Sequence, residues 1–459
     1  MLRKIRIAAA AFFFVLTTLL FLDFTGTLHA WFGWMAKIQF LPALLALNVG
    51  VVAFLVILTL LFGRVYCSVI CPLGVMQDIV SWASGKRRKH RNRFAYSPAL
   101  TWLRRGMLVV FVAAMLAGVG SLLAPYSAYG RIASNLLAPV YAWGNNLLAY
   151  IAGRMDSYAF YSVDVWMKSL STLLVAVVTF AVLFVLAWRS GRTYCNTICP
   201  VGTVLGFLAR YSLFKPRFDT SKCNGCKLCA RNCKASCIDP AAHKIDYSRC
   251  VACMDCLENC RQGAITYTLR RRKPDPAPAP QRPAADAAKT PSDASRRRFL
   301  GLAGIVAYSA LRAQEKKVDG GLAVIVDKKI PNRATPVVPP GAQSLRHFNA
   351  HCTGCQLCVS VCPNQVLRPS GKLMTLMQPE MSFERGYCRP ECTKCAEVCP
   401  TGAIRLTDLA GKSSIQIGHA VWIAENCEVN TDGVSCNNCA RHCPAGAIKM
   451  VRRDPDDPK

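Results

Sequence analysis

Twenty of the 25 cysteines in this 459-residue chain fall into five groups of four, and their spacing constrains the fold more than any other feature. Three groups follow the pattern C-x2-C-x2-C-x3-C, and two are variants with a longer first gap. In chain order the groups are Cys223, Cys226, Cys229 and Cys233; Cys250, Cys253, Cys256 and Cys260; Cys352, Cys355, Cys358 and Cys362; Cys388, Cys392, Cys395 and Cys399; and Cys427, Cys436, Cys439 and Cys443.

This is the ligand spacing of bacterial-type 4Fe–4S ferredoxins, in which three thiolates on a tight loop bind three corners of a cubane cluster. Structural zinc sites use two CxxC pairs, and five groups of the triplet-plus-one kind favour iron–sulfur over zinc. Disulfides are disfavoured because the cysteines within each triplet lie too close together to pair across a fold. The sequence therefore predicts about five 4Fe–4S clusters.

Four apolar stretches are each long enough to cross a bilayer core of about 30 Å, which takes roughly 20 helical residues. They run over Ile7–Phe24, Leu41–Phe62, Gly106–Ala124 and Leu170–Trp188, and none contains Lys, Arg, Glu or His. They predict a membrane domain of four transmembrane helices over residues 1–215.

Basic residues set the expected orientation of this domain, because loops on the cytoplasmic side are enriched in Lys and Arg. Arg3, Lys4 and Arg6 precede the first stretch, and the loop Lys86–Arg105 after the second is strongly basic. The N-terminus and that loop are therefore expected in the cytoplasm of a bacterial cell, with a multi-pass chain in the inner membrane. This bias accounts for much of the formal net charge of +30, so no nucleic-acid partner is expected.

Two soluble cluster-binding domains are expected after the membrane domain. Residues 216–272 predict a cytoplasmic double-cluster ferredoxin of α+β type, and residues 314–459 predict a second ferredoxin-like domain. The Pro/Ala-rich residues 273–294 predict an extended linker between them.

Residues 295–313 begin with Ser295–Leu300, which carries three consecutive arginines before an apolar run to Leu311. This resembles a twin-arginine (Tat) export signal; the alternatives are a short interfacial helix or a fifth membrane segment. Export in the folded state suits a cluster-binding domain, because clusters assemble on reduced thiolates that the periplasm would oxidise. The C-terminal domain is therefore expected in the periplasm.

The membrane domain contains an internal repeat, because the twelve residues Gly63–Gly74 recur as Gly191–Gly202 with eight identities in the pattern GRxYCxxICPxG. The membrane domain is therefore expected to consist of two similar halves. Each copy carries two cysteines four residues apart, which share one face of a helix. Three interpretations of these thiols stay open: ligands of a further metal or cluster, redox-active thiols, or buried packing residues. The four candidates are Cys67, Cys71, Cys195 and Cys199.

Residues 1 to about 270 resemble the NapH-type membrane iron–sulfur proteins, with their paired YCxxxCPxG motifs and a following double-cluster ferredoxin. Residues from about 295 resemble the NapG/MauM-type periplasmic ferredoxins, in the Tat-like start, the Pro339–Ala342 segment and the C-x8-C-x2-C-x3-C-P group. The resemblance implies a quinol dehydrogenase component that passes electrons from membrane quinol to a periplasmic reductase or cytochrome. The chain departs from the pattern where Lys234 and Arg261 replace the usual proline, and where it carries three C-terminal groups instead of four.

Ferredoxins of this kind exchange the fourth cysteine between neighbouring clusters. The expected cytoplasmic sets are Cys223, Cys226, Cys229 and Cys260; and Cys250, Cys253, Cys256 and Cys233, with Cys237 as the alternative to Cys233. The resemblance implies for the C-terminal domain Cys388, Cys392, Cys395 and Cys443; Cys427, Cys436, Cys439 and Cys399; and Cys352, Cys355 and Cys358 with their own Cys362 or with none.

Several one-electron centres in series indicate an electron-transfer protein, since no candidate nucleophile or acid–base pair marks a substrate pocket. A quinol site would need a proton acceptor, and Asp78 is a candidate, although a surface role explains it as well. A metal-handling, oxidase-assembly or regulatory membrane ferredoxin is the alternative function. The exported multi-cluster domain favours electron transfer, because a metal reductase needs no chain of periplasmic clusters.

Overall fold

The computed structural model describes residues 1–87, 93–118, 122–269, 335–384, 386–405, 408–418, 422, 424–443 and 446–451. The chain divides into two compact units, Met1–Ile415 and Gln416–Lys459. The linker expected at 273–294 and the Tat-like segment expected at 295–313 lie outside the described residues.

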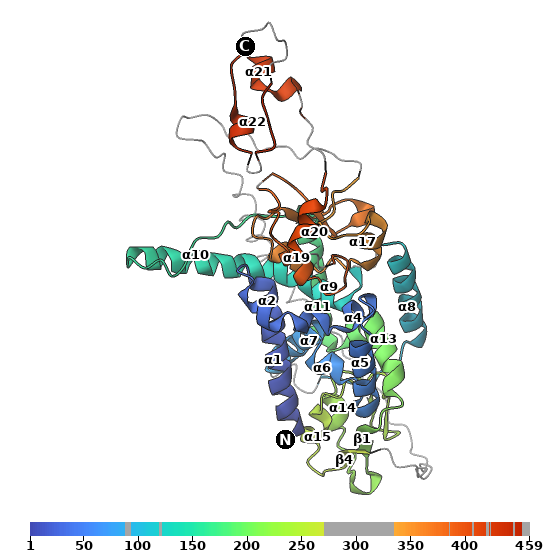
Figure 1. The fold of residues 1–459 in the computed structure, drawn as a ribbon. Helices are drawn as coiled ribbons and strands as arrows, with labels where there is room; N and C mark the ends of the chain where they lie inside the picture. Colours follow the sequence, from blue (N-terminus) through green and yellow to red (C-terminus); the bar gives the residue numbers. More distant parts are fainter. Residues whose placement is uncertain are drawn as a thin grey trace, which may run out of the picture. The chain divides into compact units, whose positions relative to one another are not determined.

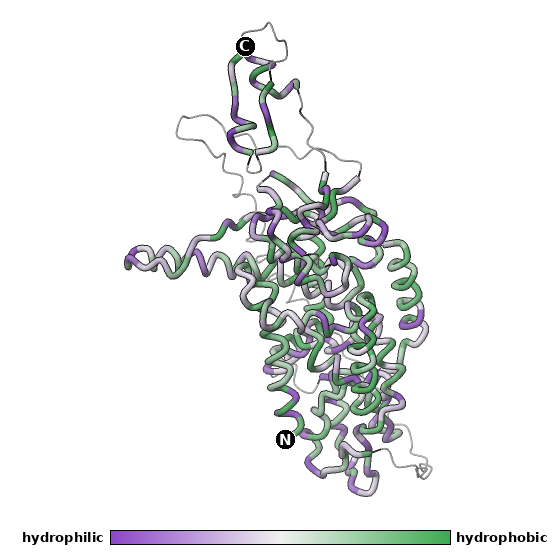
Figure 2. Tube along the Cα trace, viewed as in Figure 1, coloured by the Kyte–Doolittle hydropathy of each residue, from purple (hydrophilic) through white to green (hydrophobic). Residues whose placement is uncertain are grey.

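The helical domain supplies most of the first unit. Its helices are α1 (Leu2–Leu22), α2 (Thr27–Phe32), α3 (Trp34–Lys37), α4 (Phe40–Leu45), α5 (Val49–Phe62), α6 (Val65–Val69), α7 (Pro72–Gly85), α8 (Thr101–Leu116), α9 (Pro125–Ile132), the π-helix η3 (Ala133–Leu137), α10 (Ala138–Arg154), α11 (Leu170–Ser190), α12 (Thr193–Thr197) and α13 (Pro200–Ala209). Figure 2 shows that α1, α5 and α11 are predominantly apolar along their length.

Two helices of the described chain, α1 and α11, are long and apolar enough to cross a membrane. Each has 21 residues, which corresponds to about 32 Å. The sequence predicted four such helices, and the other two stretches are shorter in the structure. The stretch Leu41–Phe62 is divided between α4 and α5 at Leu47, whose φ of 53° interrupts the helix. The third stretch, Gly106–Ala124, begins inside α8 and extends past the end of that helix at Leu116, shortly before Gly118 at φ 77°.

The two sequence repeats form the same local structure. Each repeat follows an apolar helix, α5 or α11, and contains a five-residue helix, α6 or α12, and the start of a further helix, α7 or α13. Gly63 and Gly191 end α5 and α11 with φ of 74° and 69°, a region that residues with a Cβ avoid. Cys71 and Cys199 then take the N-cap positions of α7 and α13, each followed by a proline at the first helical position. The sequence predicted that the two cysteines of a pair share one helix face. This prediction is wrong, because α6 and α12 end between the two cysteines.

The first ferredoxin region follows the second repeat. It contains β1 (Phe214–Phe218), the 3-10 helix η4 (Thr220–Lys222), α14 (Leu228–Arg231), β2 (Ile238–Asp239), β3 (Lys244–Ile245), α15 (Asp255–Asn259) and β4 (Ile265–Leu269). The outer strands β1 and β4 pair antiparallel with Phe214 opposite Leu269, and β2 pairs with β3. This two-fold arrangement of loop, helix and strand is α+β, as expected for a double-cluster ferredoxin.

The second ferredoxin region completes the first unit with α17 (Leu345–His351), α18 (Leu357–Ser360), β5 (Leu367–Pro369), η6 (Leu373–Thr375), β6 (Pro379–Met381), α19 (Lys394–Glu397) and α20 (Leu409–Ser414). The strands β5 and β6 pair antiparallel. The second unit contains η7 (Ala424–Asn426), α21 (Glu428–Thr431) and α22 (Asn438–Arg441).

The two ferredoxin regions of the first unit contact opposite ends of α1 (Figure 1). At the N-terminal end, the Arg3 side chain lies 2.9 Å from the Asp255 carboxylate of the first region. Beyond the C-terminal end, the Lys394 ammonium of the second region donates to the Thr25 carbonyl at 3.2 Å, and α18 packs against α1 itself. One apolar helix therefore separates the two regions.

Gly191 offers a direct test of how the first ferredoxin region docks on the helical domain. An added Cβ would lie 2.5 Å from the Lys234 carbonyl oxygen, which also accepts the Arg192 N–H at 2.8 Å. We expect Gly191→Ala to destabilise the protein by about 1–3 kcal/mol. An alanine is strained at this positive φ, and its Cβ would clash with the Lys234 carbonyl oxygen. Thermal unfolding in detergent measures the effect. Gly106→Ala is the control, because nothing lies within 4 Å of that Cβ position; an equal loss in both variants would contradict the docking role.

Candidate metal centres

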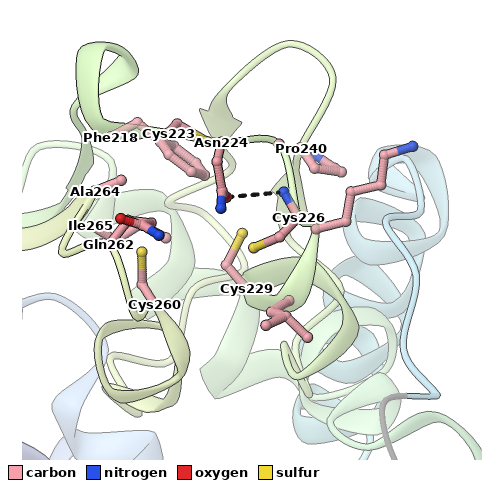
Figure 3. A pocket seen from close by; sticks show the side chains of 13 residues that line it. Phe218, Cys223, Asn224, Cys226, Cys229, Pro240, Cys260, Gln262, Ala264 and Ile265 are labelled. Carbon is pink, nitrogen blue, oxygen red and sulfur yellow. Dashed lines mark hydrogen bonds between the residues drawn. The ribbon is translucent and has the colours of Figure 1, made fainter.

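Four cysteines of the first ferredoxin region line one small cavity, cavity A, shown in Figure 3. Cys223, Cys226 and Cys229 come from one loop and α14, and Cys260 follows α15. Ala264 and Ile265, at the start of β4, close the apolar side of the cavity. The fourth thiol thus comes from the neighbouring cysteine group.

Five cysteines line the equivalent cavity B of the same region: Cys233, Cys237, Cys250, Cys253 and Cys256. The Cys233 and Cys237 sulfurs lie 3.6 Å apart, so both thiols reach this cavity. The geometry therefore leaves the choice between Cys233 and Cys237 as the fourth ligand open.

The three C-x2-C-x2-C loops share one backbone conformation. The residue after the second cysteine has positive φ in each loop, 58° at Lys227, 62° at Met254 and 66° at Gln356. The residue before the second cysteine also has a positive φ in each loop, at Gly225, Ala252 and Gly354. Alternating backbone conformations of this kind turn successive N–H groups inward and form concave anion-binding nests, which occur at many iron–sulfur sites.

In the second ferredoxin region, the fourth cysteine of each group lies near the thiols of the other group. Cys399 lies within electrostatic range of Cys352, Cys355 and Cys358. Cys362 in turn lies near Cys388 and Cys395.

The ligand sets expected from the resemblance, in which Cys399 joins the last group and the first group uses its own Cys362 or none, stay a prediction. Cys427, Cys436, Cys439 and Cys443 belong to the second compact unit. The first two C-terminal groups lie together in the first unit.

The donor sets suit clusters rather than single metal ions. Each donor set consists of cysteines alone, in the loop spacing of 4Fe–4S ferredoxins. Burial raises the pKa of Cys229 to about 11 and that of Cys395 to about 12. In the metal-free protein these thiols keep their protons at neutral pH, and cluster assembly must displace them.

The four cysteines of the sequence repeat gather inside the helical domain, although they come from its two halves. Cys67, Cys71, Cys195 and Cys199, here called the cysteine quartet, are each 5–6% exposed. Cys199 lies within electrostatic range of the other three. The quartet is thus a fifth group of four thiols in the first unit, and the most deeply enclosed.

Two buried arginines of the same repeats cross-link the halves around the quartet. Arg64 of the first repeat donates to the Cys195 carbonyl at 3.2 Å, and Arg192 of the second donates to the Cys67 carbonyl at 2.7 Å. Gly74 and Gly202 make room for these contacts, because an added Cβ would lie 2.2 and 2.3 Å from the same carbonyl oxygens. The repeated glycine, arginine, cysteine and proline positions therefore serve one shared structure, which the sequence pattern alone did not reveal.

Asp78 is a junction of three cations from separate parts of the chain. Its carboxylate lies 2.9 Å from Arg6 of α1, 2.7 Å from Arg192 and 3.1 Å from Lys234 of the first ferredoxin region. A carboxylate paired with three cations is stabilised as the anion. Asp78 is therefore a poor proton acceptor, in contrast to the role considered for it from the sequence.

Asp255 extends this network towards cavity B. Its carboxylate lies 3.0 Å from the Lys234 ammonium and 2.9 Å from Arg3. Burial alone would raise the pKa of Asp255, but Lys234 and Arg3 outweigh it and the pKa lies below its ordinary value. Lys234 follows Cys233 directly, so the ion pairs connect the lining of cavity B to α1 and α7.

A larger cavity, cavity C, of about 980 Å³ lies between α1, α7 and the first ferredoxin region. Its apolar lining includes Ala11 and Phe14 of α1 and Ile79 of α7, and its charged lining includes Asp78 and Lys234. A cavity with an apolar wall and a few convergent polar groups is typical of small-molecule sites.

Comparison with known proteins finds two family matches. A 4Fe-4S binding domain matches residues 44–90 and 172–221, which include both halves of the quartet, and a 4Fe-4S dicluster domain matches residues 351–403. The second match spans the two C-terminal groups that the structure pairs. No solved structure matches the chain.

Several curated proteins are similar to this chain. The ferredoxin-type protein NapH of Escherichia coli is 29% identical over 195 residues, 42% of this chain and 55% of NapH. The methylamine utilization ferredoxin-type protein MauN of Paracoccus denitrificans is 28% identical over 172 residues, 37% of this chain and 48% of MauN. MauM of Methylophilus methylotrophus is 33% identical over 123 residues, 24% of this chain and 50% of MauM. The chain thus spans about half the length of these relatives.

These matches support an iron–sulfur protein with 4Fe–4S ferredoxin domains and a role in electron transport. The two apolar helices and the NapH likeness agree with a membrane protein.

The Asp78 junction can be tested with Asp78→Asn. The substitution leaves Arg6, Arg192 and Lys234 without their shared carboxylate, and breaking a buried ion pair of this kind costs about 3–5 kcal/mol. We expect a lower apparent melting temperature and faster loss of the visible absorbance of the clusters on heating. Asp219→Asn is the control, because that exposed carboxylate pairs only locally, with Lys222 at 3.3 Å. Unchanged melting of Asp78→Asn would argue against the junction.

Proposed function

We propose that this chain is a membrane-bound iron–sulfur protein that oxidises quinol and passes electrons through 4Fe–4S clusters to a periplasmic reductase or cytochrome. The observation that carries the proposal is the contact of two cluster-binding regions with opposite ends of the apolar helix α1. A protein that only stored electrons in one compartment would have no need of this separation.

The proposed sidedness follows from charge. Arg3, Lys4 and Arg6 lie at the N-terminal end of α1, and basic residues favour the cytoplasmic side. The first ferredoxin region contacts this end, so it would face the cytoplasm and the second region would face the periplasm. In this proposal α8 and the pair α4–α5 complete a four-helix membrane domain with α1 and α11, over residues 1–215.

The proposed ligand sets follow the cavities and the cysteine neighbourhoods described above, with one cluster for each group and about five in all. The sets are Cys223, Cys226, Cys229 and Cys260; Cys250, Cys253, Cys256 and Cys233 or Cys237; Cys352, Cys355, Cys358 and Cys399; Cys388, Cys392, Cys395 and Cys362; and Cys427, Cys436, Cys439 and Cys443. The clusters would supply one-electron transfer.

Cavity C supports a quinol site next to these centres. Its apolar wall on α1 and α7 suits an isoprenoid-substituted ring, and its charged end can orient the ring oxygens. Lys234 lines cavity C and is adjacent in sequence to Cys233 of cavity B, which gives a short path for electrons. The ion-paired Asp78 would orient the quinol rather than accept its proton.

The sidedness can be tested with epitope tags read in spheroplasts. We expect external protease to remove a tag placed after Val451 and to leave a tag placed after Leu269 intact until the membrane is opened. The expectation rests on the two regions contacting opposite ends of α1. Protection of both tags in intact spheroplasts would contradict the proposed topology, and an intact cytoplasmic marker protein is the control for membrane integrity.

The quinol site can be tested by filling cavity C. Ala11 lines the cavity and Ala8, one turn earlier on α1, does not. We expect Ala11→Trp to weaken quinol-driven cluster reduction by roughly tenfold, the effect of losing about 1.4 kcal/mol of binding, and to leave reduction by dithionite unchanged. Ala8→Trp is the matched control and should behave like the unmodified protein. Equal quinol-driven rates in both variants would show that quinol does not use cavity C.

A further inference from the structure

Two buried arginines beside the cysteine quartet bring positive charge that neutral thiols cannot compensate. Arg64 and Arg192 are both 0% exposed, and each directs a terminal nitrogen at a quartet sulfur, 3.7 Å from Cys67 Sγ and 3.9 Å from Cys195 Sγ. A buried guanidinium is costly unless an opposite charge compensates it.

The two arginines differ in how they are compensated. Arg192 is paired with the Asp78 carboxylate at 2.7 Å. Arg64 donates to Asn196 Oδ1, the Ser248 carbonyl and the Cys195 carbonyl, all of which are neutral. Within the described part of the chain, no carboxylate forms an ion pair with Arg64. The quartet thiols Cys67, Cys195 and Cys199 lie within electrostatic range of Arg64 and can supply the balancing negative charge once they lose their protons.

Unused hydrogen-bond donors point the same way. Nε of Arg64 and Nη2 of Arg192 are buried and have no hydrogen-bond partner. Buried donors are almost always paired in folded proteins. Other buried arginines of the described chain also carry such a nitrogen, so these two donors agree with an anionic occupant of the quartet but do not identify it. Packing thiols would leave both the charge and these donors unsatisfied.

We propose that Cys67, Cys71, Cys195 and Cys199 bind an additional iron–sulfur cluster between the two halves of the helical domain, with Arg64 and Arg192 as positioning residues. Soft thiolates select iron–sulfur, zinc or copper(I). Loading releases the thiol protons, and the resulting thiolate-bound cluster is an anion. The proposal goes beyond the proposed function, because it requires neither quinol nor a particular acceptor.

The ligands are tested in the full-length protein purified without oxygen. We expect the double variant Cys67→Ser and Cys199→Ser to lose about four iron atoms per chain, one cluster's worth, together with one component of the reduced-state EPR spectrum. Ser68→Ala is the matched control, because Ser68 is buried beside Cys67 and its hydroxyl donates to the Val65 carbonyl. Unchanged iron content with every EPR component retained would overturn the proposal, as would stoichiometric zinc or a disulfide within the quartet.

A second set of variants leaves all cysteines intact. Arg64→Gln removes a positive charge that favours the more negative, reduced cluster, so we expect the midpoint potential of that one EPR component to become more negative. Arg64→Lys should largely restore it. Arg131→Gln is the control. Arg131 is equally buried, but it lies near Cys355 of the second ferredoxin region. A shift of every component by the same amount, or of none in Arg64→Gln, would overturn the positioning role.

These measurements separate the proposal from the quinol hypothesis. Iron content and the EPR potential report on the quartet when electrons come from dithionite. The Ala11→Trp variant reports on quinol and leaves the quartet unchanged. If Ala11→Trp leaves quinol-driven reduction unchanged but the EPR component of the quartet is present, the quinol site is refuted and the additional cluster stands. If the quartet variants show no loss of iron or of an EPR component but Ala11→Trp slows quinol-driven reduction, the additional cluster is refuted and the quinol site stands.

Discussion

Compensation of buried charge is the constraint on which the rest of this structure depends. The helical domain encloses Arg64, Arg192 and Asp78 in a largely apolar surrounding, where each charge needs a partner. Asp78 satisfies this need by joining α1, the second repeat and the first ferredoxin region through three ion pairs. The packing of the helical domain and the docking of the first ferredoxin region are therefore energetically coupled through one carboxylate.

The reciprocal arginine contacts explain why the domain contains a duplicated motif. Each half provides an arginine to the other half's cysteine carbonyl, and a glycine that admits the partner's arginine. One half alone would leave its arginine buried without acceptors. Duplication therefore gives a site that only the assembled pair can complete, which is the arrangement expected of a centre held between two halves.

The sequence anticipated the kind of cofactor and the local structure better than the connections. The cysteine spacing predicted cubane-binding loops, and three of them share the same pair of left-handed residues, for example around Cys226 and Cys253. Spacing does not say which neighbouring groups fold together, and only the structure places Cys362 and Cys399 each near the thiols of the other group. The four predicted spans became two long helices because Leu47 and Gly118 interrupt the others, which hydropathy does not register.

The sequence by itself determined the cysteine groups, the repeat and the basic N-terminus, because these are properties of spacing and composition. Only the tertiary structure decided that the repeat's cysteines meet in one enclosed quartet. It also decided that the Asp78 carboxylate is held in ion pairs and that the ferredoxin regions contact opposite ends of α1. The physical reason is range. A motif specifies its own backbone over a few residues, whereas charge pairing and burial depend on segments more than a hundred residues apart, which the fold alone brings together.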